Sequence, residues 1–450
     1  MELDLNLPSS ASAPVQAPPA VTSDAKPQRT DKHIWGVYMF LVIISLIELY
    51  SASSREVTSS AFGVLGPLMR HGSMLLAGFF IMLGLQKMHY RVVYAITPIS
   101  VFVAIMMMIY VLVAGEEING AKRAFTFIVT IQPSEFLKLT AAMIIAYIMS
   151  RNQLKDGRVR DRAIWISAAV VGFYGLLLIT QGLTNTLLLM AISLSMLVIG
   201  GISWRQVWNL LMAFVVVGIV VLGVSVLLTS AMPSSGDAEP VELAEGEVVK
   251  EEGIMGRINT WVARMDRFHS DGRPKYELEI NAKNRQEMYA FMAQANGGLF
   301  GVGPGNSRET SRLPLAFSDY IYSIIVEEWG LVGGMFTLLL YLWLLCRAAA
   351  IAGSCARAFP ALLVIGMAVM IGYQALFHMA IVTGVFPVSG QPLPLISKGG
   401  TSILVTSIAL GIMLSVSRHA VRTGSKKQEI KDEISELPEE IRGENLTSFN

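Results

Sequence analysis

The chain has 450 residues, of which 53% are hydrophobic and 15% are charged, and its formal net charge is +1. Because a soluble domain carries roughly 25% charged residues, this composition excludes an ordinary soluble protein and predicts a polytopic membrane protein. The near-neutral charge argues against nucleic acid as a partner, since no basic surplus is available to bind phosphates.

Residues 1–32 are rich in Pro, Ala and Ser and lack apolar periodicity, which predicts a disordered N-terminal tail. The first apolar run begins near Ile34, too late and too long for a signal peptide, and therefore indicates a membrane anchor. A membrane domain is expected over 33–418, followed by a charged, solvated tail over 419–450.

Ten apolar stretches are long enough, or nearly so, to span hydrocarbon at about 20 residues each. The predicted fold is therefore an all-α bundle of ten transmembrane helices. The stretches centre on 34–53, 71–87, 93–114, 134–150, 163–181, 184–201, 207–229, 320–345, 360–384 and 399–417.

Lys and Arg set the predicted orientation. They are frequent in the loops that share a side with both termini, as in 151–162 and 418–427, and sparse in the short loops opposite. By the positive-inside rule, both termini are cytoplasmic. Cys346 and Cys355 then fall in a cytoplasmic loop, which excludes a disulfide framework, and no cluster of Cys and His suggests a metal site.

The segment 230–319, between the seventh and eighth spans, is then a large extracytoplasmic loop. Its part from Ser230 to Glu252 is acidic and reads as linker. Beyond it, apolar residues such as Met288 and Met292 recur at helical spacing and predict amphipathic helices.

A run rich in Gly and Pro from Gly297 leads to Ser318 and Asp319, where a long apolar segment opens. Such backbone must lie in water or against protein, because hydrocarbon offers its amides no partners. Asp319 can be a helix cap, or an acid or base at the mouth of the bilayer, and the residues alone leave both readings open.

Two further irregular segments are predicted on the same side. Gln132, Pro133 and Ser134 open a span in which Glu135 and Lys138 share a helix face, either as part of a functional cavity or as a structural ion pair. The prolines within 387–402 forbid continuous helix there. Three polar interruptions of a helical bundle indicate a pocket open to the outside.

These segments resemble, in matching order, the motifs of the SEDS family (shape, elongation, division and sporulation), the FtsW/RodA proteins. The resemblance spans nearly all of 34–418 and rests on Gly120–Arg123 with Gln132–Lys138, Gly297–Ser307, Leu313–Tyr322 with Glu327–Gly330, and Pro387–Ser402.

The resemblance implies a peptidoglycan glycosyltransferase that polymerises lipid II at the outer face of the bacterial inner membrane. It implies a class B penicillin-binding transpeptidase as partner, other divisome membrane proteins and membrane lipids as neighbours, and a divalent cation, Mg²⁺ or Mn²⁺, as helper. By position, Asp319 matches the family's essential aspartate and would be the catalytic base, and it is also a candidate metal ligand. The expected substrate-binding residues are Arg123, Gln132, Ser134, Glu135, Lys138, Asn306, Ser307 and Lys398.

Some positions depart from the family pattern. Leu315 and Phe317 replace Glu and His before the aspartate, and Leu183 replaces an acid between the fifth and sixth spans. Two other classes of function stay open: a lipid II flippase, and a non-catalytic scaffold for the transpeptidase. The polar tails favour an FtsW-like role in septal wall synthesis over a RodA-like role in elongation.

Overall fold

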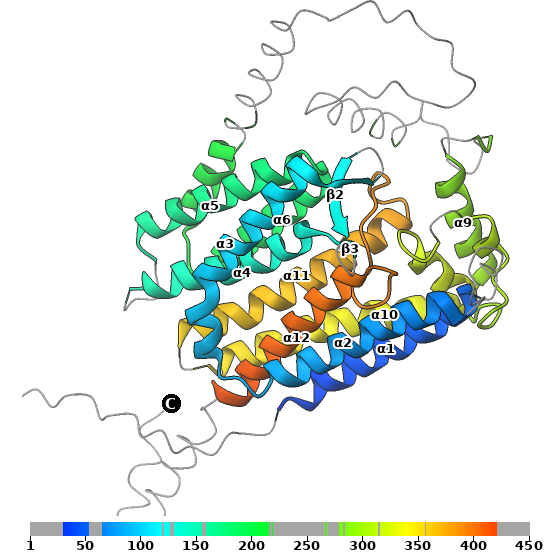
Figure 1. The fold of residues 1–450 in the computed structure, drawn as a ribbon, viewed down its shortest axis with the longest axis horizontal. Helices are drawn as coiled ribbons and strands as arrows, with labels where there is room; N and C mark the ends of the chain where they lie inside the picture. The colour runs from blue at the N-terminus through cyan, green and yellow to red at the C-terminus, as the bar shows by residue number, and fades with distance from the viewer. Residues whose placement is uncertain are drawn as a thin grey trace, which may run out of the picture.

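The computed structural model describes residues 30–53, 65–118, 121–126, 130–154, 159–214, 284–313, 316–355 and 357–420, with isolated residues at 216, 218, 265, 268 and 279–281. The described chain is a helical bundle (Figure 1). Its helices are α1 (Lys32–Ser53), α2 (Leu65–Leu85), α3 (Tyr90–Ala114), α4 (Pro133–Arg151), α5 (Asp161–Ile179), α6 (Leu183–Ile199), α9 (Arg285–Gly297), α10 (Ile321–Gly353), α11 (Ala358–Val382) and α12 (Gly400–His419).

Nine of the ten predicted spans coincide with a described helix, and most of their ends agree within a few residues. Six of these helices are long and apolar enough to cross a membrane by length and composition, and two more apolar segments, Met69–Leu85 and Leu183–Ile199, are shorter. For the predicted seventh span, residues 204–214 are helical and the remainder lies outside the described residues. The linker from Ser230 to Glu252 and nearly all of both tails also lie outside them.

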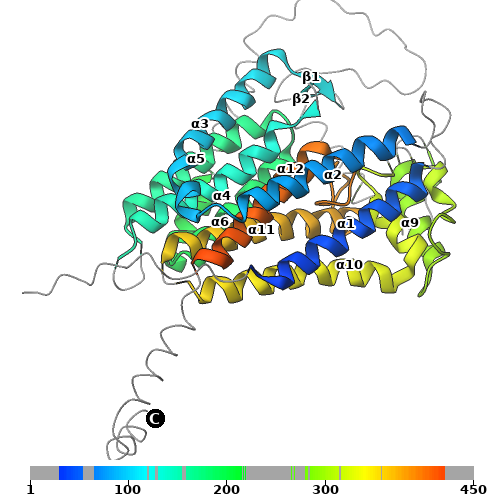
Figure 2. The same cartoon turned by 60° about the horizontal axis from the view of Figure 1, so that its bottom comes forward.

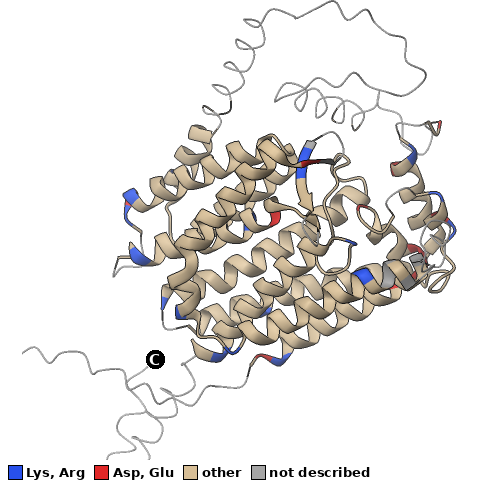
Figure 3. Ribbon diagram, viewed as in Figure 1, with Lys and Arg blue, Asp and Glu red and all other residues tan. Residues whose placement is uncertain are grey.

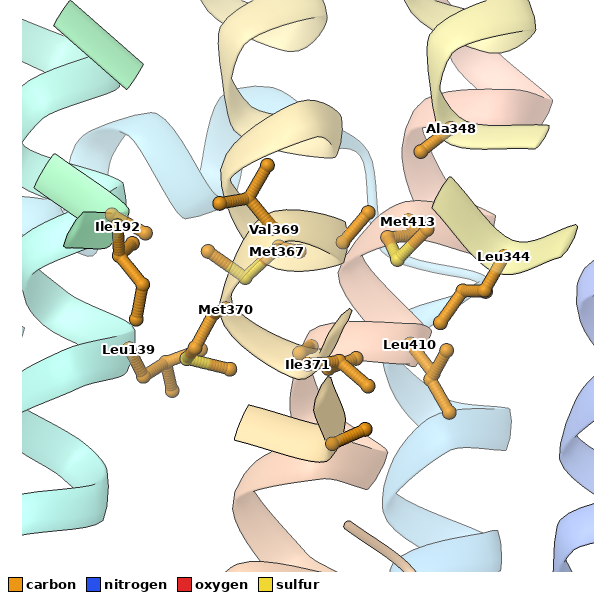
Figure 4. Close-up of a cluster of buried hydrophobic side chains, with 14 of the residues drawn as sticks. Leu139, Ile192, Leu344, Ala348, Met367, Val369, Met370, Ile371, Leu410 and Met413 are labelled. Carbon is orange, nitrogen blue, oxygen red and sulfur yellow. The ribbon is translucent and has the colours of Figure 1, made fainter. Parts of the chain in front are cut away.

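The core is built around α11. This helix packs against α10, α4, α12 and α6, and both α11 and α12 are largely buried. Figure 4 shows Met367, Met370 and Ile371 of α11 among apolar side chains of these neighbours, including Leu139 and Leu410. Met fills irregular gaps between helices, which suits a helix that is surrounded by several others.

The outer faces of the bundle are apolar as well. Phe40, Ile99 and Trp343 are large, exposed apolar side chains on α1, α3 and α10. Figure 3 places most charged residues at the two ends of the helices, with few along their middles. Exposed apolar surface bounded by charged ends is the pattern of a protein that lies in a bilayer.

A small antiparallel sheet corrects the all-α prediction. It consists of β1 (Glu116–Ile118), β2 (Ala121–Thr126) and β3 (Thr130–Ile131), and lies between α3 and α4. Phe125 pairs with Ile131 and Thr126 with Thr130. These β-branched and aromatic residues favour extended backbone, but the strands are too short to be recognised among long apolar helices.

The glycine-rich run packs against α10, where Gly330 interrupts the helix with φ 70°. Val302 N donates to Glu327 O at 3.0 Å, and Leu331 N donates to Gly298 O at 2.9 Å. A Cβ on Gly301 or Gly330 would overlap the backbone of the opposite segment. The run therefore lies against protein, as predicted, and its glycines permit two backbones to approach closely.

Candidate active site

A cavity of about 580 Å³ opens at the end of the bundle that carries the sheet and the proline loop, defined here as residues 387–399. Its volume falls within the range of roughly 300–1,000 Å³ that is typical of small-ligand sites. Five stretches that are distant in the sequence meet there, since β2, β3 and the start of α4 follow one another. They are the start of α2, strands β2 and β3, the start of α4, the turn between α5 and α6, residues 318–319, and the proline loop with the start of α12.

Asp319 lines this cavity and lies just before α10, whose N-cap residue is Tyr320. The capping reading of Ser318 and Asp319 is therefore not supported. Ser318 Oγ donates to Asp319 Oδ1 at 2.8 Å. Asp319 Oδ2 also lies close to Gly390, because a Cβ built on that glycine would be 2.8 Å from it. The carboxylate is thus held between the proline loop and its own segment.

Three cationic side chains line the same cavity, namely Arg70, Arg123 and Lys398. Asp319 is the single carboxylate among its described lining residues, so the walls carry a net positive charge. Arg123 projects from β2 and its Nε donates to Gln181 O at 2.9 Å, which fixes the guanidinium beside the α5–α6 turn. A cavity of this charge suits an anionic ligand that also presents a group for the carboxylate.

The proline loop forms one wall and is bound to its surroundings by its own backbone. Lys398 N donates to Phe317 O at 2.8 Å, and Ser397 Oγ donates to Ser318 O at 2.7 Å. These bonds join the loop directly to the segment of Asp319. Tyr341 Oη donates to Pro394 O at 2.6 Å, and His378 Nδ1 donates to Gln391 O at 2.6 Å. His378 is buried, and it supports the cavity wall.

Gln132 and Ser134 line the cavity, as expected of substrate-binding candidates. Gln132 N donates to Thr401 Oγ1 at 3.0 Å, and Thr401 Oγ1 donates to Thr130 O at 2.9 Å. The start of α4 is therefore fixed to both α12 and the sheet.

Glu135 and Lys138 are placed differently from the expectation that they are cavity residues. Both side chains are buried, Lys138 Nζ lies 2.7 Å from Glu135 Oε1, and neither residue is in the described cavity lining. Lys138 Nζ also donates to Gln374 Oε1 at 3.3 Å, while Gln374 Nε2 donates to Pro392 O at 3.3 Å. The ion pair thus supports the cavity wall from behind, because Gln374 connects Lys138 to the carbonyl of Pro392, a lining residue.

Asn306 and Ser307, which were expected to bind substrate, are not among the described lining residues of the cavity. Ser307 is buried and its hydroxyl donates to Glu327 Oε2, a carboxylate that also accepts from Arg308 N at 3.0 Å. Asn306 Nδ2 donates to Val302 O at 3.1 Å within the same loop. Both residues organise the glycine-rich run against α10.

Several lining residues were not predicted as site residues, among them Arg70, His71, Gln181, Asn185 and Ser402. The side-chain amide of Gln181 and the hydroxyl of Ser402 are buried without a partner in the part of the chain that the structure describes. Buried polar groups are normally hydrogen-bonded, so these atoms are free to bind a ligand or water. The signal for Arg70 and His71 was their position at the start of an apolar span, where ionisable residues are rarely without a function.

The lining residues fit a divalent cation only in part. No group of three or more His, Cys, Asp or Glu is assembled within the described ranges, and Asp319 stands among cationic side chains. Mg²⁺ is commonly bound by one or two carboxylates together with substrate phosphates. The arrangement therefore suits an ion that Asp319 would share with a pyrophosphate, and does not form a complete protein cage.

A second hollow of about 340 Å³ lies at the opposite end, between the ends of α6, α10 and α11. Gly200, Ala352 and Ala361 are typical of its lining, and none of its described lining residues is charged. These residues offer no acid, base or cation for chemistry.

Comparison with known families agrees with the motifs that form the cavity. The FtsW/RodA/SpoVE family model, described as "Cell cycle protein", matches residues 31–422. The chain belongs to the FtsW/RodA/SpoVE family. The resemblance read from the four motifs is thereby confirmed.

Curated relatives of the chain include FtsW proteins. The probable peptidoglycan glycosyltransferase FtsW of Halomonas elongata is 28% identical over 384 residues, which covers 84% of this chain and 87% of that protein. The protein of the same name from Dichelobacter nodosus is 26% identical over 389 residues, covering 84% and 88%.

Solved structures share the fold of this FtsW/RodA/SpoVE protein. A chain of a peptidoglycan synthase complex superposes with a TM-score of 0.62 at 23% identity and covers 86% of this chain and 98% of its own. The rod shape determining protein RodA of Thermus thermophilus superposes with a TM-score of 0.56 at 21% identity, covering 86% and 97%.

Proposed function

We propose that this protein is a peptidoglycan glycosyltransferase that polymerises lipid II into glycan strands. The observation that carries the proposal is the cavity whose described lining combines one carboxylate, Asp319, with three cationic side chains. The naming of its FtsW relatives as probable peptidoglycan glycosyltransferases supports the same activity.

In the proposed reaction, Asp319 is the general base. The 4-hydroxyl of the acceptor sugar attacks the anomeric carbon of the donor sugar, and Asp319 accepts the hydroxyl proton as the new glycosidic bond forms. The bond from the anomeric carbon to the lipid pyrophosphate breaks, and the electron pair leaves with the pyrophosphate. That group departs as a stable anion, so no second carboxylic acid is required to protonate it, unlike in glycosidases.

Arg70, Arg123 and Lys398 are positioned to bind the pyrophosphate, since they line the same cavity. Fixed positive charge at the departing group stabilises the charge that develops in the transition state. A Mg²⁺ or Mn²⁺ ion held by Asp319 and the pyrophosphate would supply further charge neutralisation when bound. Lys138 is expected to contribute only through the cavity wall, because it lies behind it.

We place the cavity at the outer face of the bacterial inner membrane. The ten apolar stretches support ten spans, and the positive-inside distribution of Lys and Arg supports cytoplasmic termini and a large outer loop between the seventh and eighth spans. The FtsW names of its relatives favour septal wall synthesis over elongation. Its structural likeness to a chain of a peptidoglycan synthase complex supports a class B penicillin-binding transpeptidase as partner.

The decisive experiment uses the purified full chain with its cognate transpeptidase and labelled lipid II. We expect glycan ladders from the wild type and none from Asp319→Asn, since the amide cannot accept the proton. Asp161→Asn, at the opposite end of the bundle, is the matched control and should retain wild-type ladders.

Two results would support the alternatives. If the protein is a flippase, the wild type makes no ladders, and the Asp319→Asn variant still translocates lipid II. A scaffold would make no ladders either, and cell growth would tolerate Arg123→Ala.

A further inference from the structure

His71 is a cavity residue to which the proposed reaction assigns no role. It lies in the N-terminal half of α2, lines the cavity together with Arg70 and Lys398, and is only 4% exposed. Its Nε2 lies 2.7 Å from Ser45 Oγ of the neighbouring α1, and Ser45 Oγ donates to Ile396 O of the proline loop at 3.3 Å. Figure 2 shows α1 and α2 in the same part of the bundle.

The positions of the protons follow from these two bonds. Ser45 has one hydroxyl proton, and the carbonyl of Ile396 can only accept it. Only one assignment satisfies both bonds, namely that His71 Nε2 carries a proton and donates it to Ser45 Oγ.

The other ring nitrogen, Nδ1, is therefore the one that a ligand can use. It makes no hydrogen bond to any residue within the described ranges. A second ring proton would place a further positive charge, largely buried, on a wall that already carries Arg70 and Lys398. The ring is accordingly neutral, and Nδ1 presents a lone pair.

A lone pair selects the chemistry of its ligand. It repels the oxygens of a pyrophosphate and binds an O–H or N–H donor. A lipid-linked amino sugar carries both kinds of donor, in its hydroxyl groups and its acetamido N–H. Arg70 and Lys398, by contrast, have only donors and suit the anionic part.

Building on the proposed function, we propose that His71 is a specificity-determining residue that accepts a hydrogen bond at Nδ1 from the sugar of the lipid-linked substrate. Ser45 is a positioning residue that fixes the tautomer. The sugar then contacts α2 beside the cations that hold the pyrophosphate.

Two substitutions separate this role from a structural one. Asn places its carboxamide near the position of Nδ1, whereas Gln places it near that of Nε2. We expect His71→Gln to raise the KM for lipid II, and its Kd, by roughly three- to tenfold, the value of one hydrogen bond, with little change in kcat. We expect His71→Asn to stay within about twofold of the wild type, because it retains an acceptor for the sugar.

Undecaprenyl pyrophosphate, which has no sugar, is the control ligand. Its Kd should be the same for the wild type and both variants. Ser45→Ala retains the imidazole but removes the hydroxyl that keeps the ring proton on Nε2. It should weaken lipid II binding by about twofold without changing the binding of undecaprenyl pyrophosphate. This third variant decides the matter should neither His71 variant fold.

The opposite ranking would overturn the proposal. If His71 only joins α1 to α2, His71→Asn loses thermal stability and binding while His71→Gln resembles the wild type. Equal weakening of both ligands would make His71 a phosphate-binding residue, and no change in any variant would remove it from the site. Absence of glycan from a wild type that binds lipid II would refute the proposed reaction and leave the binding comparison intact.

Discussion

Asp319 owes its position in the cavity to the absence of a side chain at Gly390. A Cβ at that position would come within 2.8 Å of Asp319 Oδ2, closer than carbon and oxygen normally approach. The backbone of Gly390 does not adopt a positive φ, so alanine is compatible with the loop. Glycine at this position therefore leaves space for the Asp319 carboxylate and is not required by the backbone conformation of the loop.

We predict that Gly390→Ala displaces the carboxylate and lowers the polymerisation rate by about tenfold or more, because small misplacements of a reacting group are costly. The melting temperature should change little. Glycan formation and thermal unfolding in detergent measure the two effects. Gly84→Ala in α2, where nothing lies within 4 Å, is the control, and a wild-type rate in Gly390→Ala would contradict the role of this contact.

The buried ion pair of Glu135 and Lys138 leads to a second prediction at the scale of residues. Removing one member of a buried pair leaves an unpaired charge and costs about 3–5 kcal/mol, whereas replacing both with apolar residues is often tolerated. We expect Glu135→Gln and Lys138→Met each to lower the melting temperature strongly, and the double variant Glu135→Met/Lys138→Met to recover much of the loss.

Lipid II binding by that double variant tests whether the Glu135–Lys138 pair lies behind the cavity wall. We expect binding to be retained, because neither side chain would contact the substrate. A stable double variant that no longer binds lipid II would show that the pair contacts the substrate directly.

At the scale of elements, the interrupted helix α10 depends on the glycine-rich run. Gly330 has φ 70°, and a Cβ there would overlap the carbonyl of Leu299. The two segments exchange backbone hydrogen bonds across the interruption, such as Val332 N to Leu299 O at 3.2 Å. Residues at the start of α10 are thereby fixed relative to Asp319, which lies two residues before the helix.

We predict that Gly330→Ala destabilises the fold by about 1–3 kcal/mol, the cost of a side chain in this backbone region, and more if the overlap cannot relax. Thermal unfolding would report the change. Gly305→Ala is a matched control, since Gly305 also has a positive φ of 81° but its Cβ would meet open space. Equal losses in both variants would attribute the effect to φ alone.

Sequence reasoning located helices well and side-chain partners poorly. Apolar length defines a span, so α11 was expected at 360–384 and is found at Ala358–Val382. Asp319, Arg123 and Lys138 were expected near one another; Asp319 and Arg123 share the cavity, whereas Lys138 is not among its described lining residues. Ser307 was assigned to substrate binding from the resemblance, yet its hydroxyl donates to Glu327, twenty residues further along the chain. Which of two surfaces such a loop packs against is a tertiary property.

On the scale of the whole molecule, Asp31 connects α1 to α10 at the end of the bundle opposite the cavity. Arg347 Nη2 lies 2.6 Å from Asp31 Oδ2, while Asp31 Oδ1 accepts from His33 N at 2.9 Å and from Ile34 N at 3.1 Å. Asp31 thus starts α1 and fixes it to α10, although it belongs to the segment that was predicted to be disordered. Burial alone would raise the pKa of Asp31, but the bonds from Arg347 and the two amides hold it below its ordinary value.

This contact predicts how stability depends on pH. Because the pKa of Asp31 is lowered in the folded protein, its stabilisation is complete above the ordinary pKa and is lost as the pH falls through the lowered value. We expect Asp31→Asn to lower stability by about 1 kcal/mol at neutral pH, and the difference from wild type to begin to shrink only below about pH 4, where the ordinary pKa of Asp lies, and to disappear below the lowered pKa. Melting temperatures between pH 3 and pH 8 measure this.

Arg347→Gln provides the partner test for the same contact. The double variant with Asp31→Asn should lose little more than either single variant, since both remove one interaction. Fully additive losses would mean that the two side chains act independently.

The proline loop is fixed to the helices around it by hydrogen bonds to its backbone. Its carbonyls at Gln391, Pro392, Pro394 and Ile396 each accept a hydrogen bond from a side chain of α1, α10 or α11, and Leu395 is fixed with φ 66°. Because these bonds order the proline loop before substrate binds, substrate binding costs little ordering entropy in this loop. Translocation of the nascent strand after each sugar addition would then occur by sliding of the product across a stationary surface, and the loop amides should exchange hydrogen slowly throughout the cycle.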